Sequence, residues 1–118
     1  MTTVYHYAGC STCKKALRWL AERGVQAELR PIVETPPARD ELATAVRRSG
    51  LPIQRFFNTS GQSYRQGGFG ARMASMSEDD KLDALAADGK LIKRPLLIDA
   101  RGVLVGFKPA EWEAHFGG

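Results

Sequence analysis

The sequence predicts an α/β fold in which a mixed sheet of four strands is flanked by helices. Strand, turn, helix and strand follow one another at the start of the chain, and a helical stretch occupies the middle. Two apolar runs joined by a tight turn then precede a last helix. The strand–helix–strand order at the start favours parallel pairing of its two strands, and the tight turn between the two apolar runs favours antiparallel pairing. With 118 residues, 43% of them hydrophobic, residues 1–118 are expected to form a single domain.

The opening unit is predicted as strand, helix and strand. The β-prone residues of Thr3 to Tyr7 stop at the turn-forming Ala8-Gly9, which indicates a first strand. Apolar residues then recur at helical spacing from Thr12 until Gly24, with Ser11 and Thr12 as candidate caps. A second strand around 27–32 completes a βαβ unit, whose two strands should be parallel.

The middle of the chain, about 36–90, is predicted as a helical insertion. Its apolar residues recur at helical spacing between proline and glycine boundaries. We expect a helix after the cap Thr35, a short helix through Phe57, an ordered polar loop over 58–73 and a helix between Ser77 and Gly89.

The end of the chain predicts a β-hairpin and a helix. The apolar runs 95–98 and 103–107 are separated by Asp-Ala-Arg-Gly, which is typical of a tight turn between antiparallel strands. Pro109 suits the first turn of a terminal helix. The complete order, βαβ, helical insertion, ββα, is that of a thioredoxin-like domain.

Cys10 and Cys13 stand at the predicted junction between the first strand and its helix. The free N–H groups and positive dipole end of this helix should stabilise a thiolate at Cys10, and Lys14 and Lys15 add to the field. Cys10 is therefore predicted to be a nucleophile and Cys13, one turn deeper, a resolving thiol. His6 precedes the turn and is a candidate to lower the pKa of Cys10 or to carry a proton.

Two other interpretations of the cysteines stay open at this point. A structural zinc site needs four ligands, and His6 and His115 are the only histidines beside Cys10 and Cys13. Alternatively, the two cysteines are ordinary buried thiols that pack as small apolar residues. The favoured interpretation is redox chemistry with no bound metal.

The composition of the chain indicates where the protein acts and which kinds of partner it binds. The start of the chain has no basic, apolar leader and no apolar run long enough to span a bilayer, so we expect a cytoplasmic protein with no membrane partner. Thiols stay reduced there, which favours a catalytic, redox-sensing or metal-binding Cys-X-X-Cys pair. The net charge of +4 suits an anionic substrate or acidic partner, without the basic stripe typical of nucleic-acid binding.

Four blocks in order resemble the ArsC/Spx family of glutaredoxin-like arsenate reductases and the redox-responsive regulator Spx: "VYHYAGCSTCKKALRWL", "FFNTSGQSYRQ", "LIKRPLLID" and "VGFKPAEW". The resemblance implies a thioredoxin-like core with a helical insertion. It implies that Cys10 is the nucleophile and that His6 is the histidine preceding it. Arg94 matches an arginine that contacts the oxyanion, and Pro95 matches the cis-proline that faces the cysteine.

The chain also departs from the arsenate reductase pattern. Asn58 stands in our alignment where a second anion-binding arginine is expected, and the third falls near Phe107 or Lys108. One arginine of three should hold arsenate less well, because neither Asn nor Lys reproduces planar bidentate contacts. Cys13 departs as well, since the glutaredoxin-coupled reductases use one cysteine and external glutathione, whereas Spx has an internal pair. Neutral donors and one further cation are expected beside the site: Asn58, Thr59, Ser60 and Arg65.

The sequence therefore predicts a thiol-disulfide oxidoreductase, with arsenate as one candidate substrate. Its expected partners are a small oxyanion, glutathione or a protein disulfide, and its electron donor is expected to be glutathione, thioredoxin or glutaredoxin. The alternative is an Spx-like regulator whose disulfide alters its binding to the α-subunit of RNA polymerase, without direct contact with nucleic acid.

Overall fold

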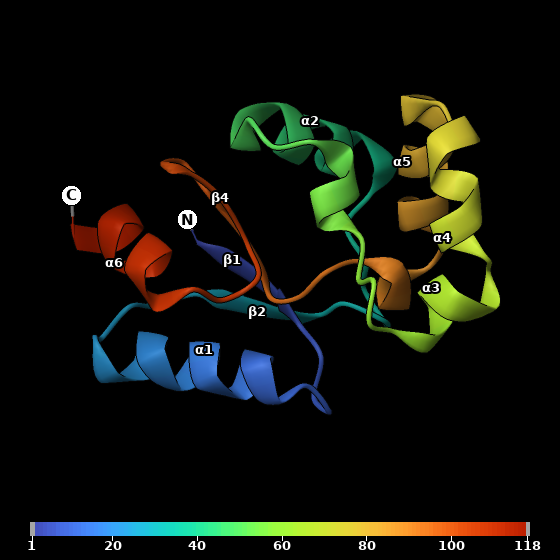
Figure 1. The fold of residues 1–118 in the computed structure, drawn as a ribbon. Helices are drawn as coiled ribbons and strands as arrows, with labels where there is room; N and C mark the ends of the chain where they lie inside the picture. Colours follow the sequence, from blue (N-terminus) through green and yellow to red (C-terminus); the bar gives the residue numbers. More distant parts are fainter. Residues whose placement is uncertain (1, 118) are drawn as a thin grey trace.

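The computed structural model describes residues 2–117 and contains the predicted mixed sheet (Figure 1). The strands are β1 (Thr3–His6), β2 (Glu28–Pro31), β3 (Leu96–Asp99) and β4 (Gly102–Val105), in the spatial order β2-β1-β3-β4. β1 pairs with β2 in parallel and with β3 in antiparallel orientation, and β3 and β4 form the hairpin. The fold class predicted from the element order is confirmed.

The sheet separates two apolar clusters. Val4 and Leu97 are paired across β1 and β3 and pack on the face with helices α1 (Ser11–Glu22) and α6 (Pro109–Gly117). Their neighbours Tyr5 and Leu96 are paired as well and point to the opposite face, because successive side chains of a strand alternate. That second face is covered by the elements between β2 and β3, which lie across the sheet from α1 in Figure 1.

The insertion is more helical than the sequence predicted. Its elements are α2 (Arg39–Ser49), η1 (Ile53–Phe56), α3 (Gln62–Gln66), α4 (Phe69–Arg72), η2 (Met73–Ser75), α5 (Glu78–Ala87) and η3 (Gly89–Leu91). The prediction of a loop over 58–73 was wrong, since α3 and α4 lie within it. The aromatic rings of Phe57, Tyr64 and Phe69 pack against one another and fix these short helices despite their glycines.

Two of the predicted helix caps were wrong. Cys10, and not Ser11 or Thr12, is the N-cap of α1, and its sulfur accepts a hydrogen bond from the backbone N–H of Cys13. Thr35 donates its hydroxyl hydrogen to the carbonyl of Pro31, and α2 starts only after Ala38, beyond the two prolines. The cap at Ser77 is confirmed, in a capping box with Asp80.

Gly89 follows Asp88, the C-cap of α5, and is the first residue of η3, where it makes a close backbone contact. A Cβ atom at this position would lie 1.9 Å from the carbonyl oxygen of Ile32, closer than any side chain tolerates. The backbone of η3 therefore packs directly on the segment that follows β2. This contact brings the chain before β3 close to the end of the first βαβ unit.

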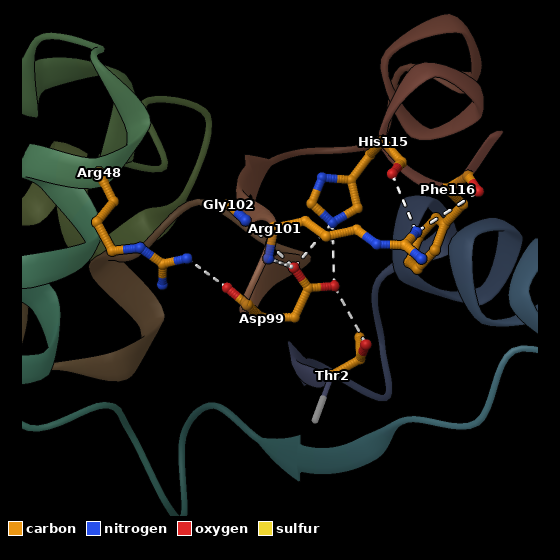
Figure 2. Close-up of polar contacts among 7 residues, drawn as sticks. All are labelled: Thr2, Arg48, Asp99, Arg101, Gly102, His115 and Phe116. Atoms are coloured by element: carbon orange, nitrogen blue, oxygen red, sulfur yellow. Dashed lines mark hydrogen bonds and ion pairs between the residues drawn. The ribbon is translucent and has the colours of Figure 1, made fainter. Parts of the chain in front are cut away.

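The hairpin turn is held by a buried carboxylate (Figure 2). Asp99 accepts hydrogen bonds from the backbone N–H groups of Arg101 and Gly102, at 2.9 and 3.2 Å, and from the hydroxyl of Thr2 at 3.2 Å. The Nε2 atom of His115 on α6 lies 3.0 Å from both Asp99 oxygens. The N-terminal segment, the hairpin and the last helix thus meet at one side chain.

Within residues 2–117, no helix is long and apolar enough to cross a membrane.

Candidate active site

Cys10 lies where β1 turns into α1, at the helix N-terminus. The backbone N–H of Cys10 donates to the carbonyl of Tyr7 at 3.0 Å, which closes the turn. The Cys10 sulfur accepts from the N–H of Cys13 at 3.3 Å. Because the residue before the first helical turn faces that helix's unpaired N–H groups, the sulfur occupies a position that favours negative charge.

The environment of Cys10 favours its thiolate. Burial acts to raise the pKa of Cys10, but the N–H and the thiol of Cys13 both donate to its sulfur and lower the pKa. The positive charge of Arg94 and the N–H of Thr12 lower it further, and the net pKa lies below that of an ordinary cysteine. Cys10 is half-buried, so a reagent can reach it.

Cys13 has the opposite character. Its side chain is buried, and this burial raises the pKa of its thiol. A hydrogen bond from the backbone of Tyr7 lowers the pKa, but the adjacent Cys10 sulfur raises it again through its hydrogen bond and its charge. The two thiols are therefore neighbours of different acidity, since the pKa of Cys10 is lowered and the pKa of Cys13 is raised.

A pocket of about 380 Å³ opens beside Cys10 and carries four cationic side chains. Five of the residues predicted from the sequence line it: Cys10, Asn58, Ser60, Arg94 and Lys108. They come from the start of α1, the chain after η1, the segment before β3 and the segment after β4. The fold thus brings together residues that are as many as 98 positions apart, 10 to 108.

Two cations of the pocket were missed by the sequence analysis: Arg55 in η1 and Lys93 before β3. Arg55 lies three residues from Asn58, the position where our alignment expected an arginine. The idea of a site with a single guanidinium is therefore corrected, because Arg55 and Arg94 both face the pocket. Lys93 directly precedes Arg94, and this adjacency is the one feature of the sequence that could have indicated Lys93 as a site residue.

Arg94 is held in place from two sides. Its guanidinium carbon lies 4.5 Å from the ring centroid of Tyr7, which is a cation–π contact. One of its terminal nitrogens donates to the carbonyl of Lys90 at 3.2 Å. The peptide bond from Arg94 to Pro95 is cis, as the resemblance implied, and Pro95 is buried. Tyr7 therefore connects the guanidinium to the turn that carries Cys10.

Comparison with known proteins agrees with this geometry. The model of the ArsC family matches residues 5–115. The chain belongs to the ArsC family. It is 45% identical to the uncharacterized protein YusI of Bacillus subtilis, over 97% of both chains. A solved ArsC-family-related protein of Bacteroides fragilis has 44% identity and a TM-score of 0.94, with 97% of this chain and 96% of that one covered.

Other proteins similar to this chain carry different names. A possible arsenate reductase of Streptococcus mutans has 38% identity and a TM-score of 0.91, with 98% of each chain covered. At lower identity, an arsenate reductase of Rhizobium meliloti is 27% identical over 85% of this chain and 70% of its own length. The global transcriptional regulator Spx of Streptococcus pyogenes is 25% identical over 97% of this chain and 84% of its own.

Other predicted residues of this ArsC-family chain lie outside the pocket. His6 is half-buried at the end of β1, is not among the pocket residues, and within residues 2–117 its side chain makes no hydrogen bond or ion pair, so its catalytic role stays a prediction. Arg65 donates to the carbonyl of Ser60 and braces that loop. His115 pairs with Asp99, away from the cysteines. In the described part of the chain, no three His, Cys, Asp or Glu side chains gather around a common point.

Proposed function

We propose that this protein is a thiol-dependent reductase that uses Cys10 as nucleophile and Cys13 as resolving thiol. The observation that carries the proposal is the pairing of unequal thiols at the mouth of a cationic pocket. Cys10 has a lowered pKa and borders the pocket, whereas Cys13 is buried behind it with a raised pKa. Nucleophilic and resolving cysteines need this difference in access and acidity.

The first step is attack by the Cys10 thiolate on one sulfur of a disulfide. A mixed disulfide with Cys10 forms, and the other sulfur leaves as a thiolate. The positive charge of Arg94 acts on the Cys10 sulfur from the same pocket. A guanidinium next to the attacked bond stabilises a departing thiolate or an anionic group on the substrate.

The second step is attack by Cys13 on the Cys10 sulfur, which releases the second half of the substrate as a thiol and forms the Cys10–Cys13 disulfide. Two of the effects that raise the pKa of Cys13 come from the Cys10 sulfur, by hydrogen bond and by charge. Both disappear once that sulfur is bound in a mixed disulfide. Formation of the mixed disulfide therefore makes Cys13 easier to deprotonate. An external thiol or dithiol, such as glutathione or thioredoxin, then restores the reduced pair.

Single-turnover reduction of a small neutral disulfide by the pre-reduced protein tests this proposal. The expected products are one Cys10–Cys13 disulfide per chain and two substrate thiols. The Cys13→Ser variant should stop at a mixed disulfide on Cys10, which mass spectrometry detects as the added mass of half the substrate. Retention of full activity by Cys10→Ser would reject the assignment.

Arsenate is a candidate substrate within the same chemistry. The possible arsenate reductase of Streptococcus mutans and the arsenate reductase of Rhizobium meliloti support it, as do Arg55 and Arg94 at the pocket. Arsenate turnover coupled to glutathione or thioredoxin decides the point. Absence of turnover beside rapid reduction of the neutral disulfide would remove arsenate from the proposal.

The second candidate function is a redox-responsive regulator. It is supported by the similarity to Spx, which extends over 97% of this chain. In this case the Cys10–Cys13 disulfide would change binding to the α-subunit of RNA polymerase. A pull-down with that subunit, using reduced and oxidised protein, tests this function, and equal or absent binding in both states would reject it.

A further inference from the structure

A second cavity adjoins the pocket beside Cys10. It has a volume of about 200 Å³, and Asn58 and Arg94 line both cavities, which we call together the groove. The second half is lined by side chains that both donate and accept hydrogen bonds, Gln62, Ser63 and Gln66, together with Lys90. The groove is therefore longer than the site around the thiol.

The groove carries charge of one sign. Among residues 2–117, its lining includes no carboxylate and these five cations: Arg55, Lys90, Lys93, Arg94 and Lys108. The whole chain is far more balanced, with 17 basic and 13 acidic residues. The excess of positive charge is thus concentrated along this groove, next to the thiol with the lowered pKa.

The length of the groove argues for an occupant larger than a tetrahedral oxyanion. The cysteine half alone has a volume of about 380 Å³, within the range of roughly 300–1,000 Å³ that holds ligands of drug size. Amide and hydroxyl side chains such as Gln62 and Ser63 are suited to the N–H and C=O groups of a peptide backbone. The cations that line the same groove are suited to carboxylates.

We propose that the groove binds an acidic peptide segment of a disulfide-bonded protein. This inference rests on the proposed function and names its substrate class. The peptide's disulfide lies at Cys10, and its carboxylates lie along the five cations. The Cys10 thiolate attacks one peptide sulfur, the other peptide sulfur leaves as a thiolate, and Cys13 then displaces the first. The protein dithiol is oxidised to a disulfide and the peptide disulfide is reduced to two thiols, so no further reductant is needed for one turnover.

The experiment compares three disulfide-containing peptides of equal length whose flanking residues are Glu, Gln or Lys. Pre-reduced protein is mixed with each peptide, and the second-order rate of thiol release is measured at low and high salt. We expect the acidic peptide to react at least about 10-fold faster than the basic one at low salt, because cationic clefts accelerate anionic partners by roughly 10 to 10³. High salt should reduce this ratio.

Lys90→Glu tests the second half of the groove, because Lys90 lines only that half. This variant should lose most of the preference for the acidic peptide, measured as the ratio of its rate to that of the neutral peptide. Arg47→Glu is the matched control: it makes the same charge change on α2, where Arg47 lines a groove facing α5. It should keep the preference.

Equal rates for the acidic and basic peptides would overturn the inference while leaving the proposed reductase intact. An equal effect of Lys90→Glu and Arg47→Glu would also overturn it, because net charge alone would then explain the preference. Failure to reduce even the neutral peptide would reject both the proposed function and this inference.

Discussion

Replacement of Asp99 by Ala should destabilise the protein by about 3 kcal/mol. The Asp99 side chain is only 6% exposed, so solvent cannot take its place as hydrogen-bond acceptor. The backbone N–H groups of Arg101 and Gly102 and the Nε2 atom of His115 lose their acceptor together, and so does the hydroxyl of Thr2. Each hydrogen bond to a charged group contributes about 1.5–3 kcal/mol, and the four losses overlap because they share one side chain.

Urea unfolding measured at pH 7 gives this loss as a difference in the free energy of unfolding. Asp88→Ala serves as a matched control, because Asp88 accepts a single capping hydrogen bond from Lys90 N–H and its removal should cost about 1 kcal/mol. A loss at Asp99 no greater than that at Asp88 would refute the view that this carboxylate holds the hairpin and α6 together.

The same side chain predicts a pH dependence. Burial acts to raise the pKa of Asp99, but hydrogen bonds from His115 and the Arg101 N–H lower it below its ordinary value. A carboxylate with a depressed folded pKa contributes stability that is present above its unfolded pKa of about 3.9 and is lost as the pH falls through the lower folded value. The wild type should therefore lose stability more steeply in acid than Asp99→Ala, and parallel curves would contradict this cause.

Two further substitutions test the site and the packing around it. Arg94→Gln should move the midpoint of Cys10 alkylation to higher pH, because the positive charge that lowers the pKa of Cys10 is removed. Arg94→Lys should retain part of the pKa lowering. An unchanged midpoint in Arg94→Gln would exclude this role of Arg94. Gly89→Ala should cost more than about 2 kcal/mol in urea unfolding, since its Cβ would lie 1.9 Å from the carbonyl oxygen of Ile32; a loss below 1 kcal/mol would show that the backbone relaxes easily.

The sheet was predictable because its signals are local. β-prone runs bounded by glycine or by Asp-Ala-Arg-Gly indicated the strands, and the lengths of their connections indicated parallel or antiparallel pairing. The short helices over 62–72 were not predictable in this way. Their glycines argue for a loop, and their stability comes from the packing of Tyr64 and Phe69 on Phe57 in tertiary structure.

The cap of α2 shows how a local rule was overridden. Thr35 is a good capping residue, but the two prolines after it keep the chain extended, and its hydroxyl is used by the carbonyl of Pro31. Conversely, Cys10 is the cap of α1 although threonine and serine stand next to it. The sulfur that caps the helix is the same sulfur whose pKa is lowered there.

The position of the two cysteines at the start of α1 could be predicted from the sequence, and that of Arg94 near Cys10 from the family resemblance, whereas the full charge of the pocket could not. The Cys-X-X-Cys spacing at a strand-to-helix junction indicates Cys10 and Cys13. Arg55 lies in a short helix with nothing in its local sequence to mark it. It lines the pocket beside Cys10 only because the insertion packs on one face of the sheet, and only the structure shows this.

The most direct test of a thiolate-based active site is the pH dependence of alkylation at each cysteine of the native protein, resolved by peptide mass mapping. Cys10 should react with a midpoint below that of an ordinary cysteine, and Cys13 should stay unmodified until the protein is unfolded. A Cys10 midpoint at or above the ordinary value, or labelling of Cys13 before Cys10, would contradict the assignment of the two thiols.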